Sequence, residues 1–126
     1  MYVLILDDDP SIGRVLCRVA QNVGLSALAV TDPLAFQTCF HRDRPDAVLL
    51  DLQIGNNDGI GQLHFLANQQ YSNAVILISG FDRRVVAAAE RLGRDLGLHI
   101  LAAVAKPFRG DDVKTLFQRL VACSSA

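Results

Sequence analysis

Five short apolar runs, separated by segments of helical character, constrain the fold of this chain more than any other feature. The runs cover residues 2–6, 27–30, 47–50, 74–78 and 100–104. Uninterrupted apolar runs of this length are typical of strands that are buried on both faces of a parallel sheet. Their alternation with helical segments predicts one α/β domain over residues 1–126, with a doubly wound five-stranded parallel sheet and helices on both faces.

Helix start signals precede several of the intervening segments. Asp9 is followed by Pro10 and Asp32 by Pro33, which is the pattern of a helix N-cap with proline in the first turn. Asp58 is expected to cap a third helix. The last segment carries apolar residues at the helical spacing i, i+3, i+4, i+7 and i+8, which are Val113, Leu116, Phe117, Leu120 and Val121. These signals predict a helix after each strand.

Composition excludes several classes of protein. With 126 residues, 51% of them hydrophobic and 20% charged, the chain is neither disordered nor too short for a core. A net charge of -1 argues against direct binding to nucleic acid or to an anionic membrane through bulk charge. No apolar run approaches the roughly 18 residues of a membrane span, and no basic signal-peptide start is present, so we expect a cytoplasmic protein. Cys17, Cys39 and Cys123 lack metal-type spacing and are expected to be reduced thiols.

Polar residues whose side chains can take part in chemical reactions come at the ends of four of the predicted strands. They are Asp7, Asp8 and Asp9 after the first run, Asp51 after the third, Ser79 after the fourth and Lys106 after the fifth. In doubly wound sheets, the carboxyl ends of the strands meet at one edge, and binding sites lie there. Lys106 stands out because the chain has two lysines against ten arginines. Because Asp9 suits the helix cap before Pro10, the sequence predicts three carboxylates, those of Asp7, Asp8 and Asp51, together with a hydroxyl and an ammonium at one site.

This set of groups suits phosphoryl transfer. Two carboxylates about 4 Å apart repel by about 4 kcal/mol at an effective dielectric constant near 20. A divalent cation such as Mg²⁺ (or Mn²⁺) relieves the repulsion, and it prefers carboxylate, water and phosphate oxygens as ligands. Lys106 would pair with a phosphoryl group, Ser79 would donate a hydrogen bond to it, and a carboxylate can attack phosphorus to form an acyl phosphate. We therefore predict Mg²⁺-assisted phosphoryl transfer onto an aspartate.

Four motifs in this order resemble the receiver domain of two-component response regulators, the CheY-like family. They are LILDDDPSI (4–12), VLLDLQIGNNDGI (48–60), VILISG (75–80) and AKPF (105–108). The resemblance spans essentially the whole chain. It implies a flavodoxin-like (βα)5 sandwich with strand order 2-1-3-4-5. It also implies a signalling partner, either a sensor histidine kinase or a phosphotransfer protein.

The resemblance assigns roles to the residues at the strand ends. Asp51 is similar to the aspartate that takes the phosphoryl group from a phosphohistidine. Asp8 is similar to the direct metal ligand, and Gln53 would add its backbone carbonyl to the metal. Asp7 would act through a metal-bound water or by positioning Lys106. The protein would then be no enzyme for an external substrate, because it catalyses only its own phosphorylation and dephosphorylation.

The same resemblance assigns the switch residues and shows where this chain departs from the family. Ser79 is similar to the hydroxyl that moves onto the phosphoryl group, Lys106 pairs with that group, and the bond before Pro107 would be cis. The usual aromatic switch position, three residues before the lysine, is Ala103. Residues 54–55 are Ile-Gly where the family usually has Met-Pro, and residues 93–108 also resemble receivers fused to cyclic-di-GMP phosphodiesterase domains.

A basic helix face is predicted between the fourth and fifth strands. At 100° per residue, four arginines fall within an arc of about 100°: Arg83, Arg84, Arg91 and Arg94. The opposite side carries Val85, Ala89, Leu92 and Leu96. This basic face is either a solvated surface or a docking surface for an output domain or a second copy of the chain.

Three other functions share part of this pattern. A haloacid-dehalogenase-type phosphatase would use Asp7 and Asp9 with Ser79 and Lys106, but it gives Asp51 no role. Its later acidic pair would have to be Asp111 and Asp112, which instead suit the start of the last helix. A flavodoxin-like cofactor binder is disfavoured because three aspartates repel a phosphate. An unphosphorylated receiver-fold interaction module stays open as an alternative because no aromatic residue stands at position 103.

Overall fold

The five predicted strands form one parallel sheet. The computed structural model describes residues 1–53, 59–80 and 83–124. The strands are β1 (Tyr2–Leu6), β2 (Ser26–Val30), β3 (Ala47–Asp51), β4 (Ala74–Ser79) and β5 (His99–Ala105). Their order in the sheet is β2-β1-β3-β4-β5, with all four pairings parallel, as predicted. Because pairing depends on the backbone, the strands continue past the apolar runs, and Asp51 and Ser79 are the last residues of β3 and β4.

A helix follows each strand. The helices are α1 (Pro10–Asn22), α2 (Pro33–Asp43), α3 (Gly59–Asn68), α4 (Arg83–Asp95) and α5 (Gly110–Ser124). The two proline-marked starts are as predicted: the Asp9 carboxylate accepts a hydrogen bond from the Ser11 N–H at 2.9 Å, and the Asp32 carboxylate accepts one from the Ala35 N–H at 2.8 Å. Asp58 and residues 54–55 lie outside the described residues. In the described part of the chain, every helix is too short or too polar to span a membrane.

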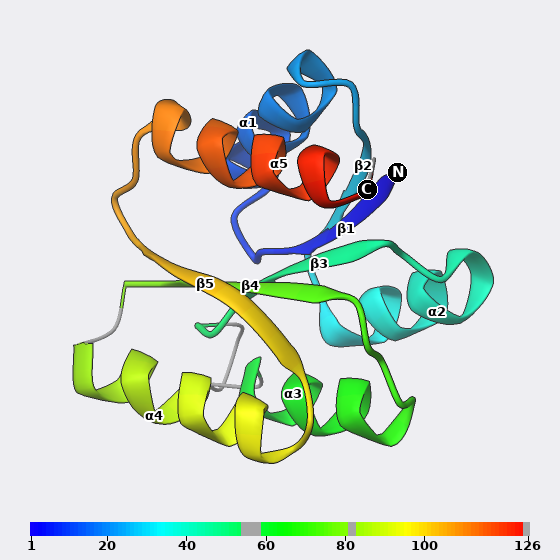
Figure 1. Cartoon of the computed structure of the whole chain (residues 1–126), viewed down its shortest axis with the longest axis vertical. Coiled ribbons are helices and arrows are strands. Elements are labelled where there is room, and N and C mark those ends of the chain that lie inside the picture. Colours follow the sequence, from blue (N-terminus) through cyan, green and yellow to red (C-terminus); the bar gives the residue numbers. More distant parts are fainter. Residues whose placement is uncertain (54–58, 81–82, 125–126) are drawn as a thin grey trace.

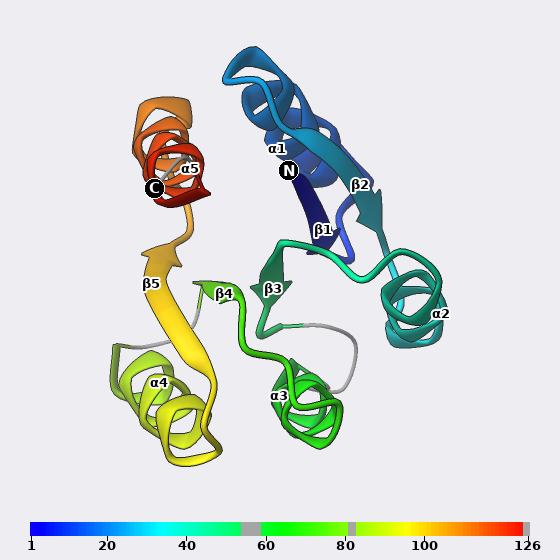
Figure 2. The same cartoon turned by 45° about the vertical axis from the view of Figure 1, so that its right-hand side comes forward.

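Helices cover both faces of the sheet, which explains why the strands are apolar without alternation. Figures 1 and 2 show α1 and α5 on one face and α2, α3 and α4 on the other. The side chains of β1 alternate between two cores: Val3 and Ile5 pack with α1 and α5, and Leu4 and Leu6 pack with α2, α3 and α4. All four are fully buried. The sheet is therefore a rigid layer whose carboxyl edge is free to hold polar groups.

The side of α4 opposite the arginines is packed at three of its four apolar residues. Ala89 is buried, and Leu92 and Leu96 pack against the core on the α2, α3 and α4 face. Val85, in the first turn, is 44% exposed. The helix starts beyond the end of β4 and then runs back along the sheet (Figure 1), so its first turn has few strand residues to pack against.

Candidate functional site

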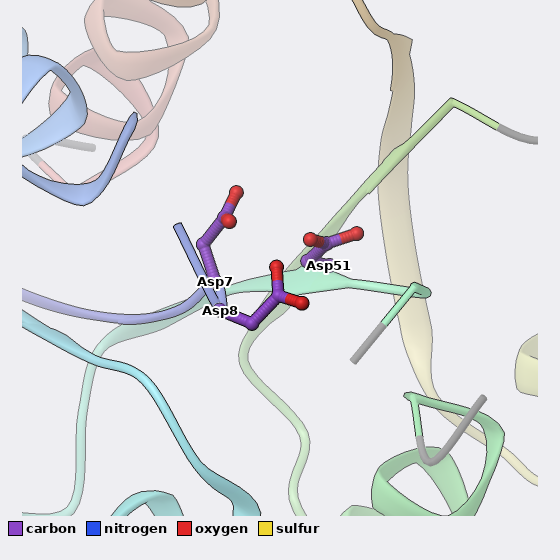
Figure 3. A group of neighbouring side chains, drawn as sticks. All are labelled: Asp7, Asp8 and Asp51. Carbon is purple, nitrogen blue, oxygen red and sulfur yellow. The ribbon is translucent and has the colours of Figure 1, made fainter. Parts of the chain in front are cut away.

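Three carboxylates meet at the carboxyl edge of the sheet. Asp7 and Asp8 follow β1 directly and Asp51 ends β3, and because these strands are paired neighbours their ends lie side by side (Figure 3). One carboxylate oxygen from each residue lies within 4.8 Å of the others. Asp7 and Asp51 are buried, whereas Asp8 is exposed. The acidic cluster of Asp7, Asp8 and Asp51 is therefore open to solvent on the Asp8 side.

Lys106 brings a cation to this cluster from the end of β5. Its ammonium nitrogen Nζ lies 2.9 Å from Asp51 Oδ2 and 3.1 Å from Asp7 Oδ2. The lysine reaches Asp51 across β4, which lies between β3 and β5 in the sheet. The peptide bond from Lys106 to Pro107 is cis, the isomer that the family resemblance implied. A single ammonium thus bridges the two buried carboxylates.

The two buried carboxylates are held by the same local device. In each, Oδ1 accepts a hydrogen bond from the backbone N–H two residues later, at 2.9 Å: Asp9 for Asp7 and Gln53 for Asp51. In each, Oδ2 is the oxygen that faces Lys106. Each carboxylate therefore has one oxygen fixed by the backbone and one turned toward the centre of the site.

Burial and charge shift the ionisation of these groups. Burial raises the pKa of Asp7 and the negative charge of Asp51 adds to the rise, while the Asp9 N–H and Lys106 oppose it. For Lys106, burial disfavours the ammonium, but the hydrogen bonds and charges of Asp51 and Asp7 outweigh this effect, so the pKa of Lys106 is raised. Lys106 therefore stays charged at neutral pH, and ionised Asp7 is under strain that a further cation would relieve.

The donor set of the acidic cluster fits a hard divalent cation. Three ionised carboxylates and one ammonium sum to a charge of −2, so Lys106 alone does not neutralise the cluster. Asp7 Oδ2 is buried, and its partner is the Lys106 ammonium at 3.1 Å. Oxygen ligands with an open, solvated side are what Mg²⁺ prefers. The role of the Gln53 carbonyl as a metal ligand stays a prediction.

Ser79 lies between the acceptor strand and the lysine. It is 1% exposed at the end of β4, its neighbour Ile78 is in register with Asp51, and Ser79 itself is in register with Ala105. Its backbone carbonyl accepts a hydrogen bond from the Lys106 N–H at 2.8 Å. The structure therefore places Ser79 in the same part of the edge as Asp51 and Lys106, as the sequence predicted.

Two features of the site were missed by the sequence reasoning. The Gln53 side chain crosses to the next loop, where its Oε1 accepts a hydrogen bond from the Gly80 N–H at 3.0 Å. An apolar cleft of about 490 Å³ opens beside the lysine, lined by Ser11, Ile12, Val15, Lys106, Pro107 and Phe108. Both join segments that are far apart in the sequence, and no local pattern signals such a contact.

The structure separates the remaining candidates from the acidic cluster. The carboxylate of Asp9 caps α1, so the Asp7–Asp9 pair that a haloacid-dehalogenase-type phosphatase needs is not the pair that clusters here. The later acidic pair of that class, Asp111 and Asp112, forms the first turn of α5. The predicted basic face lies on the exposed side of α4, and one member, Arg94, pairs with Glu90 at 3.3 Å. Ala103 is half-buried against the core on the α2, α3 and α4 face.

Comparison with known proteins decides the family. The model of the response regulator receiver domain matches residues 3–118. The chain belongs to the response regulator receiver family. A response regulator from Colwellia psychrerythraea has a similar structure, with a TM-score of 0.82, 28% identity and 97% of each chain covered. A CheY-like receiver domain from Methanospirillum hungatei shares the fold at 14% identity, with a TM-score of 0.81 over 98% of this chain and 96% of the other.

Curated relatives of this receiver domain are longer than the chain. The DNA-binding response regulator MtrA of Mycolicibacterium smegmatis is 30% identical over 107 residues, which is 85% of this chain and 44% of MtrA. The nitrogen assimilation regulatory protein NtrX of Azorhizobium caulinodans is 27% identical over 121 residues, 93% of this chain and 25% of NtrX. The chain thus spans less than half the length of either relative.

Because burial makes the ionised form of Asp7 unfavourable, we predict that Asp7→Asn stabilises the metal-free domain at neutral pH. Asn keeps the oxygen that accepts the Asp9 N–H but carries no charge. Because the pKa of Asp7 is raised in the folded state, the cost of ionising it is absent below the ordinary value of 3.8 and grows as the pH rises through the folded value. In urea unfolding with EDTA, the variant should have the higher midpoint at pH 7, and the gain should shrink as the pH is lowered.

A matched control for this prediction is Asp9→Asn. Asp9 is exposed, and Asn is as good an N-cap as Asp, so its midpoint should stay equal to that of the native protein or fall slightly. An Asp7→Asn midpoint at or below the native one at pH 7 would contradict the conclusion that ionised Asp7 destabilises the metal-free domain.

Proposed function

We propose that this receiver domain is a phosphoacceptor switch of a two-component phosphorelay, with Asp51 as the acceptor. The observation that carries the proposal is the setting of Asp51: it is fully buried, Oδ1 is held by the Gln53 N–H, and Oδ2 lies 2.9 Å from Lys106. A carboxylate fixed in this way and facing a cation is prepared to attack phosphorus. The donor would be a phosphohistidine on a cytoplasmic sensor histidine kinase or phosphotransfer protein.

In the proposed transfer, an Asp51 oxygen attacks the phosphorus of the donor, the bond from phosphorus to the imidazole nitrogen breaks, and an acyl phosphate forms. Lys106 would turn its ammonium to the incoming phosphoryl oxygens and balance their charge. Asp8, Asp51 and the Gln53 carbonyl would hold Mg²⁺, with Asp7 acting through a water or by positioning Lys106. The bound ion would neutralise charge on the phosphoryl group. Hydrolysis of the acyl phosphate in the same site would reset the domain, so no external substrate is turned over.

The apolar cleft beside Lys106 supports a protein as the donor. Because Asp51 is fully buried, a donor must reach it from the edge of the sheet, and the cleft lies at that edge between α1 and the segment after β5. Val15, in the wall of the cleft, is 48% exposed. An exposed apolar surface next to a charged site gives a partner protein a place to bind while its histidine reaches inward.

Phosphorylation of Asp51 is tested by intact mass after incubation with acetyl phosphate and Mg²⁺. The native chain should gain one phosphoryl group, and Asp51→Asn should gain none because the nucleophilic oxygen is missing. Asp9→Asn is the control and should gain the group as the native chain does, since Asp9 caps α1. An adduct on Asp51→Asn would overturn the acceptor assignment. The absence of an adduct on every variant would favour the unphosphorylated interaction module.

Binding of Mg²⁺ to the acidic cluster predicts a rise in thermal stability. An ion that binds the folded state stabilises it by mass action, by about 2.7 kcal/mol at a concentration 100 times its dissociation constant. Millimolar Mg²⁺ should therefore raise the melting temperature of the native chain and of Asp9→Asn, and raise that of Asp8→Asn much less. Identical melting curves for the native chain with Mg²⁺ and with EDTA would argue against a metal site.

We also propose that the basic face of α4 binds an output domain or a second copy of the chain. Arg83, Arg91 and Arg94 are exposed on the outer side of the helix, so this basic face is open to a partner. Reversing two charges, in Arg91→Glu/Arg94→Glu, should weaken self-association or association with an output domain in analytical ultracentrifugation. Arg109→Glu/Arg119→Glu, which reverses two exposed charges away from α4, is the charge-matched control. Unchanged association of the α4 variant would exclude this surface.

A further inference from the structure

A single peptide unit, the one between Ser79 and Gly80, is held at both of its polar groups. Its carbonyl oxygen, on Ser79, accepts a hydrogen bond from the Lys106 N–H at 2.8 Å. Its N–H, on Gly80, donates to Gln53 Oε1 at 3.0 Å. Because a peptide unit is planar and moves as one body, it cannot rotate without breaking one of these bonds. Any movement of Ser79 along with this peptide therefore has to release Lys106 or Gln53.

Gly80 provides the space that the Gln53 side chain needs. A Cβ atom at position 80 would lie 2.8 Å from Gln53 Oε1, closer than real Cβ contacts. Among the described glycines, a positive φ occurs at Gly24 and Gly97 and not at Gly80, so backbone conformation does not require glycine here. Glycine at position 80 is explained by the close approach of the Gln53 carboxamide.

Gln53 connects this peptide to the acceptor. Its backbone N–H donates to Asp51 Oδ1 at 2.9 Å, while its side chain accepts from Gly80. We propose that Gln53 is a positioning residue whose side chain latches the Ser79–Gly80 peptide in the resting state and releases it when Asp51 is phosphorylated. The release, but not the latch itself, rests on the proposed phosphoacceptor function.

Of the two hydrogen bonds that hold the Ser79–Gly80 peptide, we expect the one to Gln53 to break. The Ser79 carbonyl is bonded by the backbone of Lys106 where β4 and β5 end side by side. The Gln53 bond uses the end of a half-buried side chain that can turn about its own single bonds. Phosphorylation of Asp51 adds negative charge and so changes the electrostatic attraction on the N–H groups around it. A local change of charge of this kind can shift the equilibrium of an element that has two positions.

The latch is tested first without any phosphodonor, by amide hydrogen exchange of Gly80 in NMR spectra. Gln53→Met keeps the backbone groups and the length of the side chain but has no carbonyl acceptor, so the Gly80 protection factor should fall about five- to tenfold, the effect of one net hydrogen bond. Gln53→Glu keeps an acceptor oxygen at the same reach and should restore protection. Equal protection in the native chain and in Gln53→Met would overturn the latch.

Two further variants separate the latch from a general loss of structure. Gln37→Met removes a comparable side-chain bond, the 3.1 Å contact from Gln37 Nε2 to Gln62 Oε1 between α2 and α3, and should leave the protection of Gly80 unchanged. Gly80→Ala displaces the Gln53 carboxamide from the other side. Adding Gln53→Met to Gly80→Ala should therefore lower protection at position 80 no further than Gly80→Ala alone. Additive losses would contradict a shared bond.

The release is tested with beryllium trifluoride and Mg²⁺, which mimic a phosphoryl group on a carboxylate. Nuclear Overhauser contacts between the Gly80 amide proton and the Gln53 side-chain amide should be present in the resting protein and lost in the complex. With acetyl phosphate, Gln53→Met should be phosphorylated about five times faster, because without the latch the resting position of the Ser79–Gly80 peptide is less stable. Contacts that persist in the complex would overturn the release. A native chain that takes up neither reagent would instead overturn the phosphoacceptor function, while the exchange result would still decide the latch.

Discussion

The contact of Lys106 with two buried carboxylates is the interaction on which the site depends. Asp7 and Asp51 lie at the ends of neighbouring strands, where two ionised groups about 4 Å apart would repel by about 4 kcal/mol at an effective dielectric constant near 20. The Lys106 ammonium lies about equally close to both, at 3.1 and 2.9 Å. The ammonium offsets part of the repulsion between Asp7 and Asp51, but it does not neutralise the cluster because Asp8 adds a third carboxylate. The remaining negative charge favours the binding of a cation, and a bound cation would in turn attract a phosphoryl group.

The sheet is what allows this contact to exist. Lys106 can reach Asp51 because β4 alone lies between β3 and β5, and because two cores, one on each face, hold the strands in register. Burial makes the ionised form of Asp7 unfavourable in the folded protein, which is why the pKa of Asp7 is raised. Functional sites often hold groups that the fold would be more stable without. The apolar strands supply the stability that this edge does not.

Gln53 offers a physical link between the acceptor and the loop that follows β4. The family resemblance assigns that link in part to an aromatic residue, and this chain has the half-buried Ala103 at that position. An alanine has no side-chain rotation that could report a change at Asp51. In the switch proposed here, the change would instead pass through hydrogen bonds: from Asp51 to the Gln53 backbone, and from the Gln53 side chain to the Ser79–Gly80 peptide.

The sequence by itself determined the parallel sheet, the starts of α1 and α2, and the edge at which the chemistry lies. It could do so because burial on both faces and helix capping are local properties of residues such as Leu4, Asp9 and Asp32. The order of the strands came from the family resemblance. Only the tertiary structure decided which oxygens face Lys106, that Gln53 reaches Gly80, and that Val85 lies beyond the packed part of α4. These features depend on distances between segments far apart in the chain, which helical or strand periodicity does not contain.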